Sequence, residues 1–441
     1  MRRRDFLLSA LAKTTPDELR DIAAVHVAIA EKYRDGRKIW GRIGGSPAEH
    51  ESAAALASQL RSYLPQVKLE SFRFHAHRAR EWQVQMDGRT IETAMVAPFE
   101  ARFPDHAVSA PLAAADPDRQ DWSALRGKWA LVHSNATTST AQNIVREKLL
   151  YQRAVQHGAA GLLFSLATPK TSRWKSIVPV DKPYALKDER YPGGLRPIPC
   201  FSMDAVDGAA TALTGKGTVS ATVRYDAEEE HEGRNVVGFL PGSGGYAAGI
   251  MCHLDSFFGG ACDNASGMAA MVGLARELSR LSKTARKPDL WFLGMSAHHD
   301  EAAGTRAWGA RDAQRLARIR QLFLLEHVDA LDTPEGHEAG WHMPLNNNRT
   351  AYFGSGGWPE VKALVPTLVR ETGVMTAAPA MQDACIADLF VTCDRVKGFC
   401  LMNTPPYYHT DHDTLDKISA AGIGNAVRFH LRLLQGLQLV S

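Results

Sequence analysis

The sequence of 441 residues is poor in cysteine, in net charge and in long apolar runs. Its six cysteines include no CxxC pair, and we interpret them as free buried thiols in a reducing compartment. The formal net charge is +3, and no Lys/Arg block is interleaved with aromatic residues, so we expect no nucleic-acid partner. No stretch suits a membrane span, and the 45% hydrophobic content is ordinary for a globular protein with a large core.

The N-terminus, MRRRDFLLSALAK, resembles a twin-arginine export signal. Its apolar stretch over residues 6–12 ends at Lys13, and no small-residue cleavage site follows before a helical pattern begins. We therefore predict a cytoplasmic protein, with export through this N-terminus as the alternative.

The hydrophobic pattern changes twice along the chain. Residues 16–64 repeat apolar positions at three and four, which predicts two amphipathic helices. The next stretch alternates as strands do, and His75 and His77 lie on one face of it. These two histidines can pair as metal ligands, but no third ligand is near in sequence, which favours an ordinary polar strand face.

Residues 99–226 contain short strands and loops, with the motifs LRGKWALVHS, HGAAGLLF and PIPCFSM. This set resembles the protease-associated domain that is inserted in several peptidase families. From residue 235, apolar strands alternate with helices, which predicts an α/β fold with a mixed, mainly parallel sheet flanked by helices. We predict a catalytic domain in two parts, residues 14–98 and 230–441, separated by an inserted β-rich domain over residues 99–229.

Several of these strands end at side chains that can bind metal. His253 lies in CHLDS, His299 in SAHHDE and Asp329 in EHVDA, while Asp263 opens the helix after FFGGACD. A further group, PPYYHTDHDTLDK, lies near the C-terminus. One such residue alone is usually a cap or a satisfied core group, but the set together indicates a metal site.

In order, the motifs HLDS, GGACDNASGMAAMVGLAR, HVDA and YYHTDHDTLDKI resemble the co-catalytic zinc aminopeptidases, the family of bacterial leucyl aminopeptidase and glutamate carboxypeptidase. The resemblance implies hydrolysis of an amide or peptide C–N bond by a metal-activated water. It also implies one or two divalent metals, zinc above all, and a small peptide or amide as substrate. A homo-oligomer is compatible with it.

The resemblance carries over to individual residues. It makes Asp263 a carboxylate that bridges two metals, with His253 and Asp329 completing one site and His409 the other. Asp255 then holds the imidazole of His253. The same resemblance implies that Tyr408 faces the developing oxyanion and that a cis peptide bond follows Asp263.

The sequence departs from the family where the family has two adjacent glutamates, a general base and a metal ligand. Here the aligned residues are His298 and His299, placed by the Gly-Thr at 304–305. A register shifted by two residues would assign these roles to the acids at 300–301. In the first interpretation His299 binds metal and His298 is the base. The alternatives are a hydrolase with one metal acting on a non-peptide substrate, and an inactive binding or scaffold protein.

Overall fold

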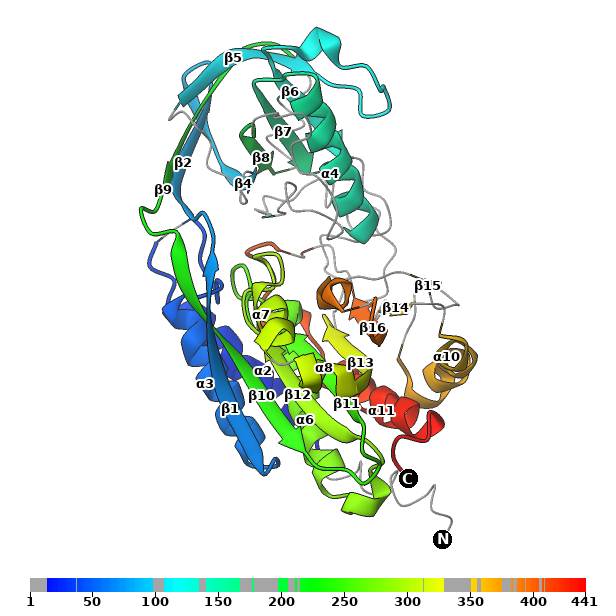
Figure 1. Cartoon of the computed structure of the whole chain (residues 1–441). Coiled ribbons are helices and arrows are strands. Elements are labelled where there is room, and N and C mark those ends of the chain that lie inside the picture. The colour runs from blue at the N-terminus through cyan, green and yellow to red at the C-terminus, as the bar shows by residue number, and fades with distance from the viewer. Residues whose placement is uncertain are drawn as a thin grey trace.

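We describe part of the chain in a computed structural model, in which two eight-stranded sheets form two units (Figure 1). The described residues are 14–36, 38–97, 107–134, 140–166, 177, 197–204, 211, 215–311, 313–328, 350–354, 358–374, 382–383, 387–392, 394–403, 407 and 409–441.

The first sheet has the strand order β1-β10-β12-β11-β13-β16-β14-β15. Its central strands β12, β11, β13 and β16 are parallel, whereas β1, β10 and β14 join antiparallel neighbours. The predicted mixed, mainly parallel sheet is therefore confirmed. The strands are β1 (Gln66–His75), β10 (Glu230–Leu240), β11 (Ala247–His253), β12 (Asp289–Met295), β13 (Ile319–Glu326), β14 (Thr350–Gly354), β15 (Gln382–Asp383) and β16 (Lys397–Asn403).

Helices cover both faces of this sheet, because its central strands are apolar on both sides. One face packs against α2 (Pro16–Lys32), α3 (Pro47–Arg61), α6 (Gly267–Ser279), α10 (Pro359–Thr372) and α11 (Ala420–Gly436). The other face packs against α7 (Ala303–Arg311) and α8 (Ala313–Arg318). The two predicted N-terminal helices are α2 and α3, which begin at the N-caps Thr15 and Ser46.

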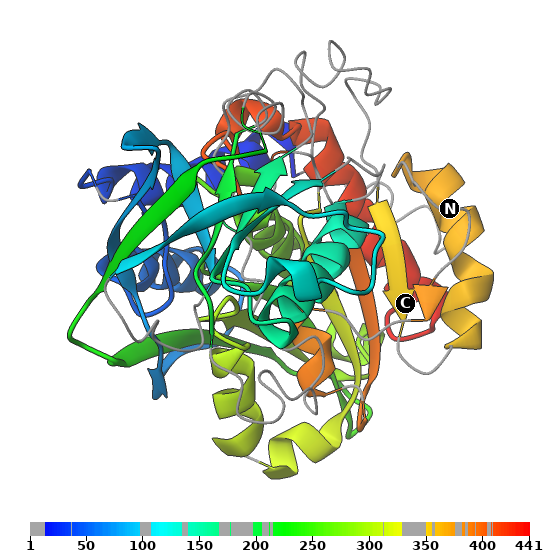
Figure 2. The same cartoon turned by 90° about the horizontal axis from the view of Figure 1, so that it is seen from above.

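The second sheet has the order β3-β2-β9-β5-β6-β7-β8-β4. It begins at residue 79, inside the range predicted for the first domain, because β2 pairs with β9 and not with β1. From above (Figure 2), α4 (Thr140–Gln156) and this sheet overlie the middle of the molecule, whereas α10 lies to one side. The strands are β2 (Ala79–Met86), β3 (Arg89–Ile91), β4 (Thr93–Ala97), β5 (Ala107–Ala114), β6 (Trp129–Ser134), β7 (Gly161–Leu166), β8 (Cys200–Met203) and β9 (Thr218–Tyr225).

Two short connections join the units. Residues 76–78 lead from β1 to β2, and residues 226–229 lead from β9 back to β10. They lie side by side (Figure 1), because the Ala76 N–H donates to the Glu229 carbonyl at 2.9 Å and the Asp226 N–H donates to the Arg78 carbonyl at 2.8 Å. The connections therefore form a paired backbone link between the two sheets.

The cysteines in the described part of the chain agree with the sequence interpretation. Cys200, Cys252, Cys262 and Cys400 are buried thiols, and none of them forms a disulfide with another described residue. Cys385 and Cys393 lie outside the described residues.

Within the described residues, no helix combines the length and the apolar character needed to cross a membrane. Residues 1–13 lie outside this part of the chain, so the cytoplasmic location stays a prediction.

His26 on α2 makes stability depend on pH. It is fully buried, with Nδ1 at 2.7 Å from Ser52 Oγ, and burial together with the Arg42 charge lowers its pKa to about 3. The unfolded chain, with a histidine pKa of about 6.5, binds the proton more tightly, so stability falls as pH drops from 6.5 towards 3. We expect a loss of about 2–3 kcal/mol between pH 7.5 and 4.5 from this residue alone.

Denaturant unfolding of the wild type and of His26→Asn at several pH values measures this loss, because Asn keeps a polar group facing Ser52 but does not titrate. The free energy of unfolding of the variant should depend less steeply on pH. Parallel curves for the two proteins would contradict the prediction.

Candidate metal centre

The parallel strands bring the candidate residues to one edge of the first sheet. His253 ends β11, the pair His298 and His299 follows β12, Glu326 ends β13, and His409 follows β16. Ligand sites of open α/β sheets lie at these carboxyl ends of the strands. The connectivity thus gathers residues that are up to 156 positions apart, from 253 to 409.

Three atoms without protons converge on one point, namely a ring nitrogen from each of two histidines and one oxygen of Asp263. His409 donates from Nδ1 to the Ile177 carbonyl at 2.6 Å, and His299 donates from Nδ1 to Asp255 at 2.6 Å. Burial lowers the pKa of both rings, that of His409 to about 3, so both are neutral and their Nε2 atoms carry lone pairs. These Nε2 atoms are 3.0 Å apart, and His409 Nε2 is 3.0 Å from Asp263 Oδ2. Such lone pairs repel each other unless a cation lies between them.

A second group lies on the other side of Asp263. His253 donates from Nδ1 to the Asp255 carbonyl at 2.9 Å, and its Nε2 faces Asp263 Oδ1 at 3.1 Å and Glu326 Oε1 at 3.3 Å. His327 Nε2 is 2.9 Å from Asp263 Oδ1. Together, His253, Glu326 and His327 form a buried group with the spacing of metal ligands.

Buried polar atoms without hydrogen bonds mark the same place. His253 Nε2, Asp263 Oδ2 and Glu326 Oε2 are buried and make no hydrogen bond to any described residue. Burial raises the pKa of both acids, but His327 and the other imidazoles lower that of Asp263 well below its usual range, and His253 lowers that of Glu326 to about 2. Both carboxylates are therefore ionised, and a buried carboxylate needs positive charge close by, from a protonated imidazole or from a bound cation.

The charge balance also fits a metal. Five buried carboxylates surround the centre, with the Arg42 guanidinium beside it, and against the effect of burial they raise the pKa of three imidazoles, those of His253, His298 and His327. A divalent cation would take the place of the protons on such rings, and zinc accepts imidazole and carboxylate ligands. The acids are Asp255, Asp263, Glu326, Asp388 and Asp413.

Asp255 differs from its predicted role. Its carboxylate does not hold His253, whose Nδ1 is 3.8 Å from Oδ1, but accepts the ring N–H of His299 and the main-chain N–H groups of His298 and His299. The loop after β12 turns so that these donors point at Asp255, while His253 reaches the main-chain carbonyl of the same residue. Burial raises the pKa of Asp255, but His299, together with His253 and His298, lowers it below its usual range. The hydrogen bond from His299 Nδ1 to this carboxylate fixes the tautomer of His299.

His298 is held by an acid that we did not find from the sequence. Its Nδ1 is 2.9 Å from Asp388 Oδ2, and Asp388 Oδ1 accepts from the Thr305 hydroxyl at 2.8 Å. The ring stacks on that of His253, with centroids 4.3 Å apart, and its Nε2 faces Glu326 at 3.8 Å. Burial lowers the pKa of His298, but the Asp388 carboxylate raises it, and the net shift is upward.

The two acids that follow this pair point elsewhere. Asp300 accepts two hydrogen bonds from Arg78, at 2.6 and 2.8 Å, and Glu301 is 3.8 Å from Arg306. The structure therefore places the histidines, and not these acids, against the metal centre.

Buried residues from the rest of the chain support the centre. Arg42 donates to the carbonyls of Leu254, Gly259 and Gly260, which fixes the segment between β11 and α6. Asp413 accepts the N–H groups of Cys262 and Asp263 at 2.8 and 3.0 Å. The predicted cis peptide bond between Asp263 and Asn264 is confirmed.

Two predicted site residues, Asp329 and Tyr408, lie outside the described residues. Glu326 and His327 occupy the end of β13, and sequence reasoning missed both. Both residues belong to the motif LLEHVDA at the end of this strand, in which the family resemblance points to the Asp. Asp388 had no motif at all.

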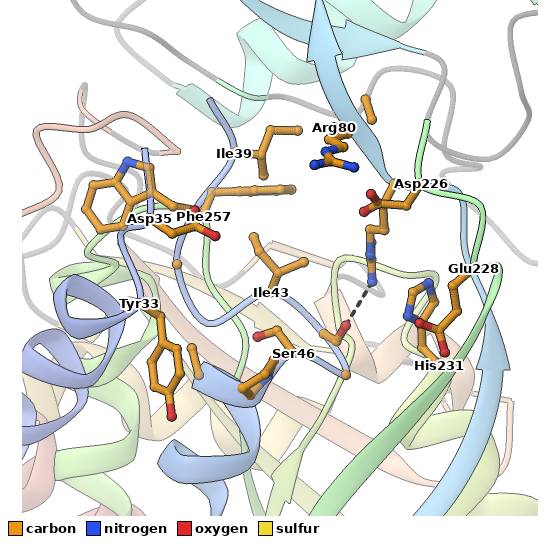
Figure 3. A pocket seen from close by; sticks show the side chains of 18 of the residues that line it. Tyr33, Asp35, Ile39, Ile43, Ser46, Arg80, Asp226, Glu228, His231 and Phe257 are labelled. Carbon is orange, nitrogen blue, oxygen red and sulfur yellow. Dashed lines mark hydrogen bonds between the residues drawn. The ribbon is translucent and has the colours of Figure 1, made fainter. Parts of the chain in front are cut away.

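A cavity of about 480 Å³ lies beside the centre (Figure 3). It is bounded by the loop from Tyr33 to Ala48, by both connections between the sheets, and by Phe257. The Phe257 ring also contacts the rings of His299 and His409, with centroids 4.8 and 5.0 Å apart. This side chain thus lines the cavity and also contacts two histidines of the centre.

Fold and site together define a metallo-hydrolase with a buried centre of histidines and carboxylates at the edge of an α/β sheet. Residues 235–434 match the model of Peptidase family M28. A search of curated proteins found no match.

Solved structures share the fold over nearly the whole chain. A zinc aminopeptidase from Bacillus subtilis is 19% identical, with a TM-score of 0.63 over 93% of this chain and 94% of that one. An aminopeptidase from Aneurinibacillus sp. strain AM-1 is 18% identical, with a TM-score of 0.61 over 97% and 95%. A peptidase M28 precursor from Shewanella amazonensis SB2B is 15% identical, with a TM-score of 0.68 over 97% and 96%.

Proposed function

We propose that this protein hydrolyses an amide or peptide C–N bond of a small substrate, in the manner of an aminopeptidase, with histidines in place of the usual glutamate pair. The observation that carries the proposal is the convergence of buried imidazoles and carboxylates on Asp263, with atoms of His253, Asp263 and Glu326 left without a hydrogen bond in the described part of the chain, because a metal ion would satisfy them all. Zinc suits the donor set, and the Bacillus subtilis neighbour is a zinc aminopeptidase.

Two metals are favoured over one, because Asp263 presents a different oxygen to each group. Its Oδ1 faces His253 and His327, and its Oδ2 faces His409. His253, Glu326 and His327 would hold one ion, and His299 and His409 the other. When bound, such a pair of ions polarises a carbonyl and makes water a nucleophile near neutral pH.

His298 is the proposed general base. The Nδ1–H group of His298 donates a hydrogen bond to the Asp388 carboxylate, so the Nε2 atom carries the lone pair and faces the centre. Asp388 is then a positioning residue, since it orients the ring and stabilises the imidazolium formed when Nε2 takes a proton from water. The site with two histidines carries less negative charge than one with two glutamates, which favours anionic substrates.

The substrate would lie in the cavity of Figure 3, next to the centre. Its lining combines apolar side chains, among them Trp40 and Ile43, with the charged Arg80, Asp226 and Glu228. Concave sites of this composition fix a substrate through a few polar groups and apolar contact. We also propose that the unit with the second sheet is the inserted protease-associated type, and that its Ile177 carbonyl positions His409.

The experiment that tests the function is metal analysis of protein purified without chelator, combined with a screen of aminoacyl arylamides and small amides. We expect about two zinc ions at the centre of each chain, and turnover that is lost on chelation and restored by zinc. A fully loaded protein that hydrolyses no amide in the screen would support the scaffold alternative instead.

Glu326 and Asp329 are alternative carboxylate ligands for the ion at His253. We expect Glu326→Gln to lose one metal per chain and most activity, because the buried Glu326 carboxylate faces His253 at 3.3 Å. Asp329→Asn serves as the matched variant and should keep both metals. Metal content of the two variants decides the ligand, and loss of metal in Asp329→Asn alone would restore the assignment made from the sequence.

A further inference from the structure

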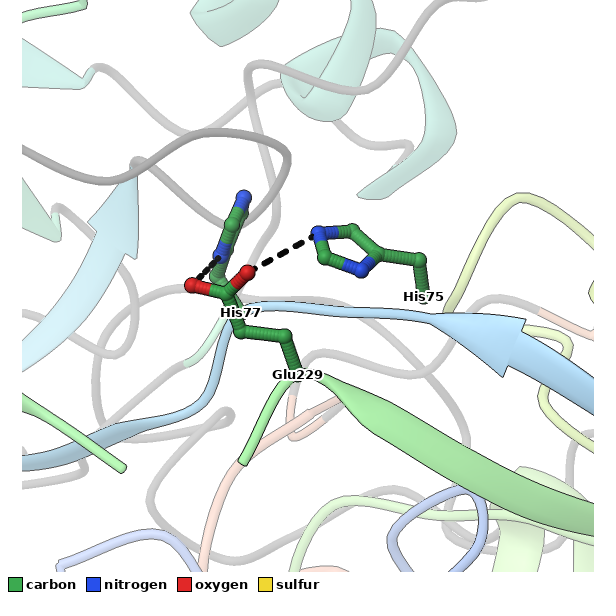
Figure 4. Close-up of side chains that lie close together, drawn as sticks. All are labelled: His75, His77 and Glu229. Carbon is green, nitrogen blue, oxygen red and sulfur yellow. Dashed lines mark ion pairs between the residues drawn. The ribbon is translucent and has the colours of Figure 1, made fainter. Parts of the chain in front are cut away.

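A second cluster of histidine and carboxylate side chains lies at the paired connections, away from the metal centre (Figure 4). His75 ends β1, and His77 follows in the first connection. Glu229 is the last residue of the second connection, directly before β10. The pair of histidines was visible in the sequence, and the fold supplies a third ligand from 152 positions further along the chain, from 77 to 229.

The geometry suits one small cation. The Glu229 carboxylate faces both rings in Figure 4, with Oε2 at 3.6 Å from His75 Nε2 and Oε1 at 3.6 Å from His77 Nδ1. One ligand atom from each residue lies within 4.8 Å of the other two. Ligands about 2.0–2.1 Å from a tetrahedral zinc ion are themselves about 3.3–3.5 Å apart, so the two distances of 3.6 Å between Glu229 and the histidines need only a small contraction.

A fourth residue gives His75 the surroundings of a metal ligand. Glu230 Oε1 is 3.5 Å from His75 Nδ1, the ring nitrogen that faces away from Glu229. Histidines that bind metal through one nitrogen usually donate the other N–H to a carboxylate or carbonyl, which fixes the tautomer and strengthens the ligand. A plain ion pair would not require acids on both nitrogens of the same ring.

The backbone holds the three ligands in place before any ion binds. The Ala76 N–H donates to the Glu229 carbonyl at 2.9 Å, so the residue between the two histidines is tied to the residue that bears the carboxylate. The site is also accessible, because the side chains of His75, His77 and Glu229 are 51%, 15% and 36% exposed. An ion can therefore enter from solvent and leave one coordination position for water.

We propose that His75, His77 and Glu229 form a second transition-metal site, with zinc as the reference ion, that cross-links the two connections between the sheets. The cavity of Figure 3 is lined by the residues that follow His77, from Arg78 to Arg80, and by those that precede Glu229, from Asp226 to Glu228. Metal at this place therefore fixes one wall of that cavity. The site does not depend on the proposed activity.

Equilibrium dialysis of the full chain against zinc, followed by elemental analysis, tests the proposal. His77→Ala and Glu229→Gln should each bind one zinc ion fewer than the wild type, and crystals of the wild type should show an anomalous zinc peak between the three side chains. Glu230→Gln should keep the site but weaken it about 10–100-fold, as expected for a partner of a metal-bound histidine. His157→Ala, a histidine on the other unit beside Asp121, is the matched control and should keep the wild-type count.

Two results would overturn the proposal. One is an unchanged zinc count in His77→Ala and Glu229→Gln at saturating zinc. The other is a lower zinc count in these variants in which the anomalous peak that disappears is the one at the Asp263 centre and not one at the connections. Glu229→Gln preserves side-chain shape, so it remains decisive if His77→Ala does not fold.

Discussion

Replacing Asp263 by alanine is expected to remove nearly all metal from the centre and all amide hydrolysis. This carboxylate is the residue that both ligand groups share, with Oδ1 facing His253 and Oδ2 facing His409. Without it His299 and His409 keep no carboxylate between their Nε2 atoms, and His253 and His327 keep only Glu326, so both ions are held far more weakly. Elemental analysis of the purified variant and its turnover of an aminoacyl arylamide measure the two losses.

Asp121→Asn is the matched control, because Asp121 is an exposed acid on the other unit and its loss leaves the centre intact. Asp263→Asn is a second variant of nearly identical shape, which separates loss of metal from loss of the fold. An Asp263→Ala protein that still carries its full complement of zinc would refute the assignment of the centre.

His298 and His299 should fail in different ways, although they are adjacent in sequence. His298→Ala should lower turnover by about two to four orders of magnitude and keep both metals, as expected for loss of a general base. His299→Ala should lose one metal, because His299 Nε2 points at His409 Nε2 and Asp263. Parallel measurements of turnover and metal content distinguish the two roles.

The pH dependence of turnover tests the role of His298 as the general base. The wild-type rate should fall as pH drops through the pKa of His298, because the protonated ring cannot accept a proton. The Asp388 carboxylate raises this pKa against the effect of burial, so Asp388→Asn should move the acid limb to lower pH and reduce turnover. An unshifted limb in that variant would remove Asp388 from the mechanism.

Changing both histidines to glutamate separates a retuned enzyme from an inactive relative. A retuned enzyme should lose its native activity, since its substrate suits the less negative site, whereas an inactive relative should gain peptidase activity. If single alanine variants of both histidines leave turnover and metal content unchanged, Glu301 becomes the base to test.

Much of the fold could be predicted from local patterns. The two opening helices, the strands from β10 to β13 and the last helix all carry periodic apolar residues, and each has the predicted type. The order of apolar strands and helices also predicts parallel strands, because such connections return to the same edge of the sheet. That edge then gathers His253, His299 and His409 without any knowledge of distances.

The sequence by itself determined the mixed α/β class, because this follows from the periodicity of apolar residues, and the resemblance of its motifs to a known family predicted that His253, Asp263, His299 and His409 lie near one another as metal ligands. Only the tertiary structure decided which acid holds which ring. Asp255 serves His299 and not His253, Asp388 holds His298, and Glu229 joins His75 and His77. These pairings join residues up to 154 positions apart, from 75 to 229, and no local pattern encodes them, since they depend on how loops and strands turn once the core has packed.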